Sequence, residues 1–449
     1  MKTTDMTKGN ITPLLIKFAI PVFAGSLFQQ LYNTVDSIVV GNYVGKEALA
    51  AIGSTTSLIN SMIGFFMGLA TGAGVVISQY FGAKDTVNLR KTVHTMILGT
   101  IIAGIVVTFA AIYSSPLLLR LMNTPDDVIT LSDDYLVIYF EGVIFLMLYN
   151  IGSGILRAVG DSKRPLYFLI ITSIINVVLD LVFVIKFNLG VQGVAYATII
   201  SEAVSAVMVM WVLFSSRECY QLRIKELKIS GNVLKRVLKI GLPGGIQMAL
   251  TAFSNVFVQG YINYFGSSCM AGWASYNKVD IFALLPMQSI ALANTTFTGQ
   301  NYGAGNMLRV KEGVKKSLYL SLVSTFILII PIMLFSKTFV SIFNQDKEVI
   351  YYGSYFLIVC SPFYLLCCIN QIYAGALRGL GNATIPMIFM LSSFVLFRQI
   401  YLFTVTHITR AFFPVSIAYP MGWILCSALM FVYYKKYINR LTTDCTNIS

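Results

Sequence analysis

The chain has 449 residues, of which 56% are hydrophobic and only 11% charged. A soluble domain is closer to half apolar and about a quarter charged, so this composition excludes an ordinary soluble globule. The formal charge of +13 at pH 7 would fit a nucleic-acid-binding protein, but the placement of the basic residues argues against that class.

Apolar segments long enough to cross a membrane recur along the whole chain, since about 20 helical residues span the hydrocarbon. They are long, continuous and rich in Leu, Ile, Ala and Gly, whereas the strands of membrane barrels are short and alternating. We therefore predict an all-α integral membrane protein with twelve transmembrane helices. The predicted spans are 12–40, 47–81, 92–119, 131–156, 165–187, 190–214, 237–265, 269–301, 317–341, 350–377, 384–406 and 412–434.

The lysine and arginine residues are segregated between the two predicted sides of the membrane. If the N-terminus is cytoplasmic, 24 of the 32 basic residues fall on the cytoplasmic side and six in outer loops. This is the positive-inside pattern of membrane proteins. It explains the basicity as topology, predicts that both termini are cytoplasmic, and leaves no reason to expect a nucleic-acid partner.

Two motifs recur at one spacing and reveal an internal repeat. GILRAVGDSKRP at Gly154–Pro165 returns as GALRGLGNATIP at Gly375–Pro386, and QYFGA at Gln79 returns as QNYGA at Gln300, both with a shift of 221 residues. The two halves each hold six spans and begin on the same side, which predicts lobes related by an axis along the membrane normal. We expect lobes at 1–214 and 235–449, joined by a cytoplasmic linker at 215–234, with a cleft between them.

These motifs resemble those of the multidrug and toxic compound extrusion (MATE) transporters, particularly the bacterial DinF-type branch. The likeness extends over nearly the whole chain and includes DSIVVGNYVGKEALAAIG after the first span and NVVLD in the fifth. Transporters of this kind exchange a substrate, often an organic cation, for an inward-moving proton or sodium ion. The resemblance implies the same exchange here.

Ionisable residues inside lipid are costly unless they face a cavity or a partner, so each is a functional candidate. Of the five carboxyl residues singled out in the predicted spans, four lie in the first half, which places ion coupling in the amino-terminal lobe. The seven ionisable candidates are Asp36, Glu141, Asp180, Glu202, Lys278, Asp280 and Arg398.

The first-half acids are expected at one depth. Asp36 and Asp180 each lie about eight residues, or roughly 12 Å, from the outer ends of their helices, and Thr198 lies at the same level. Asn176 and Asp180 share a helical face, as do Thr198 and Glu202, and Gln29, Asn33 and Asp36 form a third polar stripe.

The resemblance implies that Asp36, Asn176, Asp180 and Thr198 occupy the ion-coupling positions of the family's amino-terminal lobe. Other MATE branches use acids in helices seven and ten, where this chain instead has polar amides, Gln247, Asn255, Gln259 and Gln371. This departure disfavours a sodium site of that kind in the carboxyl-terminal lobe. Sodium at the amino-lobe residues stays open, and no other metal or cofactor is expected.

The candidate substrate cavity comprises Gln29, Asn33, Tyr139, Glu141, Asn150, Glu202 and Gln288. The mechanistic hypothesis is that protonation of Asp36 or Asp180 rearranges the first helix at Pro21 and expels the substrate. The alternative is that the two aspartates only hold helices together. For Glu141 and Glu202 a cavity wall and a structural network are both open. For Lys278 and Asp280 we favour pairing between helices.

The alternative functions are a flippase and, less favoured, a membrane-embedded enzyme. A flippase for lipid-linked or polysaccharide precursors would need a basic cavity for diphosphate substrates, and only Lys278 and Arg398 are available. A membrane-embedded enzyme would need a catalytic constellation, and the chain has two His and no HExxH motif. We expect a monomer in the plasma membrane, with a small organic substrate and membrane lipid as its partners.

Overall fold

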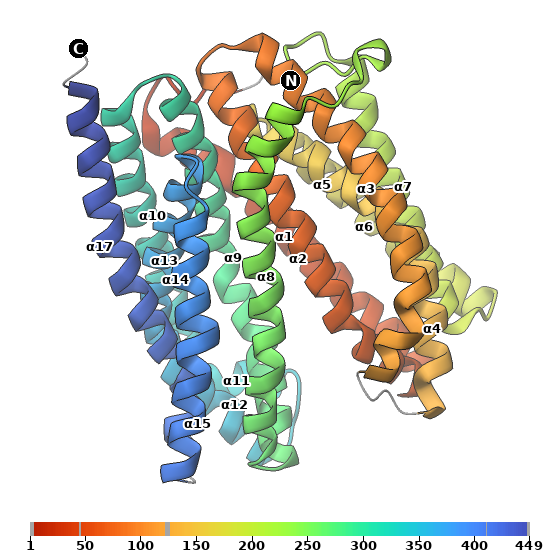
Figure 1. Ribbon diagram of the computed structural model, residues 1–449. Coiled ribbons are helices and arrows are strands. Elements are labelled where there is room, and N and C mark those ends of the chain that lie inside the picture. The colour runs from red at the N-terminus through yellow and green to blue at the C-terminus, as the bar shows by residue number, and fades with distance from the viewer. Residues whose placement is uncertain (1–3, 45, 122–125, 410, 447–449) are drawn as a thin grey trace. The chain divides into compact units, whose positions relative to one another are not determined.

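A computed structural model describes residues 4–44, 46–121, 126–409 and 411–446, and these residues form helices without any strand (Figure 1). The principal helices are α1 (Ile11–Val39), α2 (Lys46–Gly82), α3 (Thr86–Leu121), α4 (Asp126–Glu141), α5 (Val143–Ala158), α6 (Lys163–Leu181), α7 (Gly190–Ser215), α8 (Gly231–Asn263), α9 (Ser267–Gly303), α10 (Met307–Leu334), α12 (Lys347–Cys360), α13 (Tyr364–Gly379), α14 (Thr384–Leu391), α15 (Arg398–Ile408) and α17 (Ala418–Thr446). Short elements complete the chain: η1 (Val40–Val44), η2 (Val182–Lys186), η3 (Ile224–Glu226), α11 (Ser336–Ser341), η4 (Ser361–Phe363), η5 (Ser392–Phe397) and α16 (Phe412–Ser416).

Grouped by their breaks, these elements match the twelve predicted spans. The fourth span is the pair α4 and α5, bent by 46° at Gly142. The tenth is α12, η4 and α13, and the eleventh is α14, η5 and α15. Within the described residues, nine helices are long and apolar enough to cross a membrane, and the bent pair makes a tenth. α8 and α17 do not reach that apolarity.

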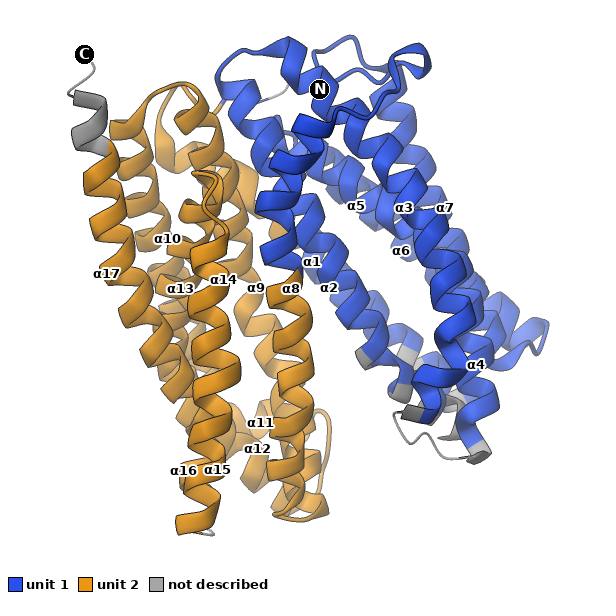
Figure 2. Cartoon of the chain, in the orientation of Figure 1, with its two compact units in different colours: residues 1–5, 24–245 blue, residues 6–23, 246–449 orange. Residues whose placement is uncertain are grey.

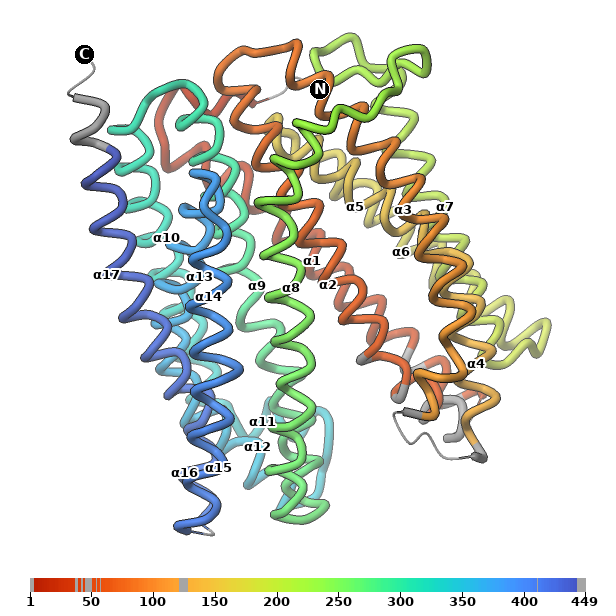
Figure 3. Tube along the Cα trace, viewed as in Figure 1, coloured from red at the N-terminus to blue at the C-terminus, as the bar shows by residue number. Residues whose placement is uncertain are grey.

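The chain forms two compact units, coloured separately in Figure 2. Unit 1 comprises residues 1–5 and 24–245, and unit 2 comprises 6–23 and 246–449. They differ from the sequence halves because the first helix of each half is divided: the start of α1 packs in unit 2, and the start of α8 packs in unit 1. The paths of both helices can be followed in Figure 3.

Glycines on two helices explain why the start of α8 packs in unit 1. Gly68 and Gly72 on α2 meet Gly245 and Gly241 on α8, and a Cβ built on Gly72 would lie 2.5 Å from the Gly241 Cα. Only paired glycines allow two helix backbones to approach this closely, as in small-xxx-small contacts within membranes. In unit 2 the start of α1 packs instead through apolar side chains, Leu15 and Phe18, against Phe297 of α9.

In each unit a repeated glutamine accepts a hydrogen bond from the segment that the other sequence half contributes. In unit 1, Gln79 Oε1 accepts a hydrogen bond of 2.7 Å from Arg236 at the start of α8. In unit 2, Gln300 Oε1 accepts one of 2.9 Å from the backbone N–H of Met6, just before α1. The repeated motif therefore holds the first helix of the other sequence half in each unit.

The second repeated motif ends a helix in each half. Gly160 and Gly381 have φ of +87° and +90°, a left-handed conformation that favours glycine. The backbone N–H of Asp161 donates to Leu156 O at 2.9 Å, and that of Asn382 donates to Leu377 O at 2.8 Å. These bonds satisfy carbonyls at the ends of α5 and α13, the usual role of a glycine just beyond a helix.

Candidate functional site

The two aspartates of the predicted ion site lie on neighbouring helices of unit 1. Asp36 is one turn before the end of α1, and Asp180 is the penultimate residue of α6. Each helix continues into a π-helical segment, η1 and η2, and these two segments contact each other. π-helical turns are rare and frequent at functional sites, because the wider turn redirects side chains.

The Asp36 and Asp180 carboxyl groups lie within hydrogen-bonding range of each other. Asp36 Oδ1 and both Asp180 oxygens are buried and receive no hydrogen bond from a donor group in the described residues. Two ionised carboxylates offer no proton to share and repel each other. The pair is therefore satisfied when it holds one proton or a bound cation.

Tyrosines and a third acid surround this pair. Tyr135 on α4 interacts electrostatically with both aspartates. Tyr139, one turn further on, interacts with Glu202 of α7. Tyr32 on α1 interacts with Asp36 and Glu202 and hydrogen-bonds with Gln29. The site is thus acidic, and among the described residues no lysine or arginine forms an ion pair with its three carboxyl groups.

Several other polar groups of unit 1 are buried without a hydrogen-bond partner in the described chain. Both amide atoms of Asn176 are in this state, as are the hydroxyls of Ser173 and Ser201 and one carboxylate oxygen of Glu202. Buried polar atoms are normally paired. Groups left free on α6 and α7 are therefore available to water, an ion or a substrate.

The remaining residues of the predicted ion site and cavity make local contacts. The Thr198 hydroxyl donates to Val194 O at 3.0 Å, and the Asn150 amide donates to Leu146 O at 2.9 Å. Asn33 is exposed and its amide lies 3.5 Å from Gln30 Oε1. Glu141 is exposed at the bend between α4 and α5.

Gln288 is exposed on α9 in unit 2. The expectation for Lys278 and Asp280 of α9 is pairing with other helices, not with each other, and Asp280 does interact electrostatically with Tyr364 of α13. No ion pair of the described residues includes either group. The Lys278 ammonium lies 5.1 Å from the centroid of the Phe343 ring, and Asp280 accepts a hydrogen bond of 3.2 Å from Tyr276. Two residues apart on one helix, the two groups point in different directions.

Arg398 has a structural place in unit 2. Its guanidinium is buried, donates to Ser254 and Asn255 of α8 at 3.0 and 2.8 Å, and lies 4.5 Å from the centroid of the Tyr419 ring.

Sequence reasoning missed Tyr32, Tyr135, Ser173 and Ser201 as members of the unit 1 site. Their spacing contained a signal, since Tyr32 is four residues before Asp36 on α1, and Ser173 is seven residues before Asp180 on α6. Tyr32 already falls within the stripe from Gln29 to Asp36, and extending the Asn176 and Asp180 stripe by one turn would have found Ser173.

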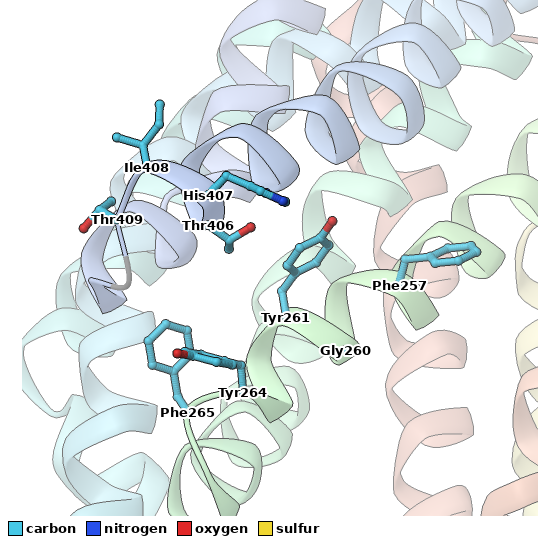
Figure 4. A pocket seen from close by; sticks show the side chains of 9 residues that line it. All are labelled: Phe257, Gly260, Tyr261, Tyr264, Phe265, Thr406, His407, Ile408 and Thr409. Carbon is cyan, nitrogen blue, oxygen red and sulfur yellow. The ribbon is translucent and has the colours of Figure 1, made fainter.

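Unit 2 has a cavity of about 770 Å³ between the later part of α8 and the end of α15 (Figure 4). Its walls include Phe257, Tyr261, Tyr264 and Phe265 of the α8 region and His407 of α15. In the view of Figure 4 the aromatic side chains of the end of α8 and of the turn after it lie opposite His407. Such walls suit apolar ligands and lipid chains.

The fold and the acidic amino-terminal site define a multi-span membrane transporter. A family model described as MatE matches residues 21–182 and 243–403, once in each half. The chain belongs to this family of MATE multidrug efflux transporters and is not an enzyme. Transporters of this family use ion coupling and need no cofactor.

Relatives along most of the chain carry multidrug-resistance names. YoeA of Bacillus subtilis strain 168, named a probable multidrug resistance protein, is 29% identical over 98% of both chains. NorM of Thermotoga maritima, with a similar name, is 26% identical over 83% of this chain and 81% of its own. The multidrug export protein MepA of Staphylococcus aureus MSSA476 is 22% identical over 98% of this chain and 97% of its own.

Solved structures share the fold. A MOP-superfamily transporter from Pyrococcus furiosus superposes with a TM-score of 0.93 at 23% identity, covering 98% of this chain and 100% of that one. An outward-facing multidrug resistance MATE transporter gives the same TM-score and identity, with coverage of 98% and 99%. The Pyrococcus protein is described as having a binding pocket of reverse polarity that suggests a different function. Fold alone therefore does not name a substrate.

Proposed function

We propose that the chain exports small cationic organic compounds by antiport with protons through alternating access. The observation that carries this proposal is the Asp36 and Asp180 pair, buried in unit 1 within hydrogen-bonding range and without a lysine or arginine partner in the described residues. An acidic site of this kind attracts cations. It is also an unfavourable environment for diphosphates, which weighs against a flippase.

In the proposed cycle the carboxyl pair takes up a proton from outside and releases it inside. The pair without its proton carries two repelling charges, which favours a state that holds an organic cation or water between α1 and α6. Uptake of a proton removes that repulsion and favours closure of the same helices. Pro21 lies inside α1 next to the division between the units at 23 and 24, and provides a place where the helix can bend.

Coupling requires that the two states differ in affinity for the proton and for the substrate, and the carboxyl pair provides such a difference. Asn176 on α6 and Thr198 on α7 are the proposed additional oxygen ligands. Sodium is the competing coupling ion, since the same carboxylate, amide and hydroxyl oxygens can coordinate it.

The test uses purified protein in liposomes, with pH and sodium gradients imposed separately and transport of a fluorescent organic cation as the readout. We expect movement driven by the pH gradient. Asp36→Asn and Asp180→Asn should each lower that movement at least tenfold, whereas Asp134→Asn should retain it. Asp134 is an acid of the same unit whose carboxylate accepts from Gln192 at 3.1 Å on an exposed surface.

Two results would refute the proposal. One is normal pH-driven transport by the folded Asp36→Asn protein. The other is transport that responds only to sodium. Binding of the substrate by Asp36→Asn without pH-driven release would instead support a coupling role, because binding and coupling would then be separated.

Topology and assembly are part of the proposal. The positive-inside pattern supports cytoplasmic termini, a cytoplasmic linker at 215–234 and functional lobes at 1–214 and 235–449. Single cysteines introduced into the linker of an otherwise cysteine-free variant should react with membrane-impermeant reagents only after the cells are opened. Light scattering of the purified protein should give the mass of a monomer.

A further inference from the structure

A basic cavity of about 650 Å³ lies in unit 1, where the segment before α8 crosses the beginning of α3. Arg90 and Lys91 of α3 form one wall. Glu226 of η3, Lys228 and Ile229 form the other. Neither the proposed ion site nor the MATE fold assigns this cavity a ligand.

Hydrogen bonds fix the two walls relative to each other. The backbone N–H of Arg223 donates to His94 Nε2 at 3.0 Å. The Thr95 hydroxyl donates to Lys228 O at 3.3 Å and accepts from the backbone N–H of Ser230 at 3.1 Å. His94 and Thr95 are buried on α3. These hydrogen bonds hold the segment before α8 against α3 and fix the two walls of the cavity.

The charges of the cavity are unbalanced. Glu226 is the carboxylate of its walls, and it is shared between Arg90 at 3.8 Å and Arg223 at 3.2 Å. Lys91 and Lys228 form no ion pair in the part of the chain that the structure describes. Asp85, which interacts electrostatically with Lys91, is occupied in accepting the backbone N–H of Asn88 at 3.0 Å. A ligand with negative charge would complete the site.

Apolar side chains lie beside the basic side chains in this cavity. Val87 and Ile229 line the same cavity, with exposed fractions of 63% and 38%. The candidate membrane span Thr86–Arg120 begins at this cavity, so these side chains lie at the end of a membrane helix. A soluble anion would leave them in contact with water, whereas a phospholipid offers a phosphate to the cations and acyl chains to Val87 and Ile229.

We propose that this cavity binds the headgroup of an anionic phospholipid. The phosphate contacts Lys91 and Lys228 and competes with Glu226 for Arg90. Because the ligand joins α3 to the segment before α8, occupancy adds to the hydrogen bonds that hold this segment against α3. A basic residue near an anionic membrane surface strengthens binding by about 1 kcal/mol, or roughly fivefold.

The test is native mass spectrometry of the full chain released from mixed micelles of phosphatidylglycerol and phosphatidylcholine. We expect the wild-type protein to retain one phosphatidylglycerol that the variant Arg90→Gln, Lys91→Gln, Lys228→Gln loses. The control with an equal change of charge is Lys435→Gln, Lys436→Gln, Arg440→Gln at the end of α17, which should retain the lipid. Equal loss by both variants would show general charge attraction and overturn the proposal.

A second variant distinguishes specific loss of the lipid site from misfolding of the protein. Glu226→Gln removes the competing carboxylate, and we expect it to bind phosphatidylglycerol roughly fivefold more tightly in lipid titrations. A misfolded protein would not gain affinity. Unchanged or weaker binding by Glu226→Gln would contradict the proposed geometry. Displacement of the lipid by millimolar inorganic phosphate would show a soluble-anion site and would refute the lipid assignment.

Discussion

The contact between α2 and α8 in unit 1 allows a quantitative test through a single methyl group. A Cβ added at Gly72 would lie 2.5 Å from the Gly241 Cα and N and 2.9 Å from Val237 O. All three are backbone atoms, so no side chain can rotate away. Restoring an ordinary contact near 3.5 Å requires the two helices to separate by about 1 Å, an overpacking that costs about 1–3 kcal/mol.

The matched control is Gly74→Ala on the same helix, where the added Cβ would lie 3.6 Å from Gly154 O in ordinary contact. Both variants replace a helical glycine by alanine, so the gain of about 1 kcal/mol in helix propensity cancels between them. We expect Gly72→Ala to be less stable than Gly74→Ala by about 1–3 kcal/mol, measured by SDS titration in mixed micelles. Two variants within about 0.5 kcal/mol of each other would refute the close approach of these helices.

Three further predictions concern the repeated glutamines, the buried Arg398 and the first turn of α3. Gln79→Ala and Gln300→Ala should each lower the unfolding free energy by about 1–2 kcal/mol in the same titration, because each removes the acceptor of a hydrogen bond from the other sequence half. No change in either variant would contradict this role of the repeat. Arg398→Leu should cost about 2–3 kcal/mol, because two hydrogen bonds from a buried charge are lost, and full stability of Arg398→Lys would show that the paired donors of the guanidinium do not matter. The hydrogen bond from the backbone N–H of Asn88 holds the pKa of Asp85 below its ordinary value. The stabilisation of the first turn of α3 by the Asp85 carboxylate is therefore present above the ordinary pKa of about 3.9 and is lost as the pH falls through the folded pKa. Hydrogen exchange of the amides in this turn should show this pH dependence in the wild type but not in Asp85→Asn. The same dependence in both proteins would contradict the role of the Asp85 hydrogen bond.

Part of the site was accessible from sequence, because helical spacing places residues three and four apart on one face. The shared helical face of Asn176 and Asp180 required only the helical period. Pairing between helices was less accessible. Pairing of Lys278 and Asp280 with other helices is expected from sequence, but neither residue forms an ion pair in the described residues. The partners of a side chain on α9 depend on the neighbouring helices, which no spacing within α9 reveals.

Composition, hydropathy and the 221-residue repeat by themselves determined a membrane protein of twelve spans in two related halves. Membrane insertion follows from the length of the apolar segments, and the duplication is visible as repeated sequence motifs. The tertiary structure alone decided that α1 and α8 are each divided between units, that paired glycines set the approach of α2 to α8, and that Asp36 lies beside Asp180. These features depend on backbone contacts between segments distant in the chain, and local sequence patterns do not contain that information.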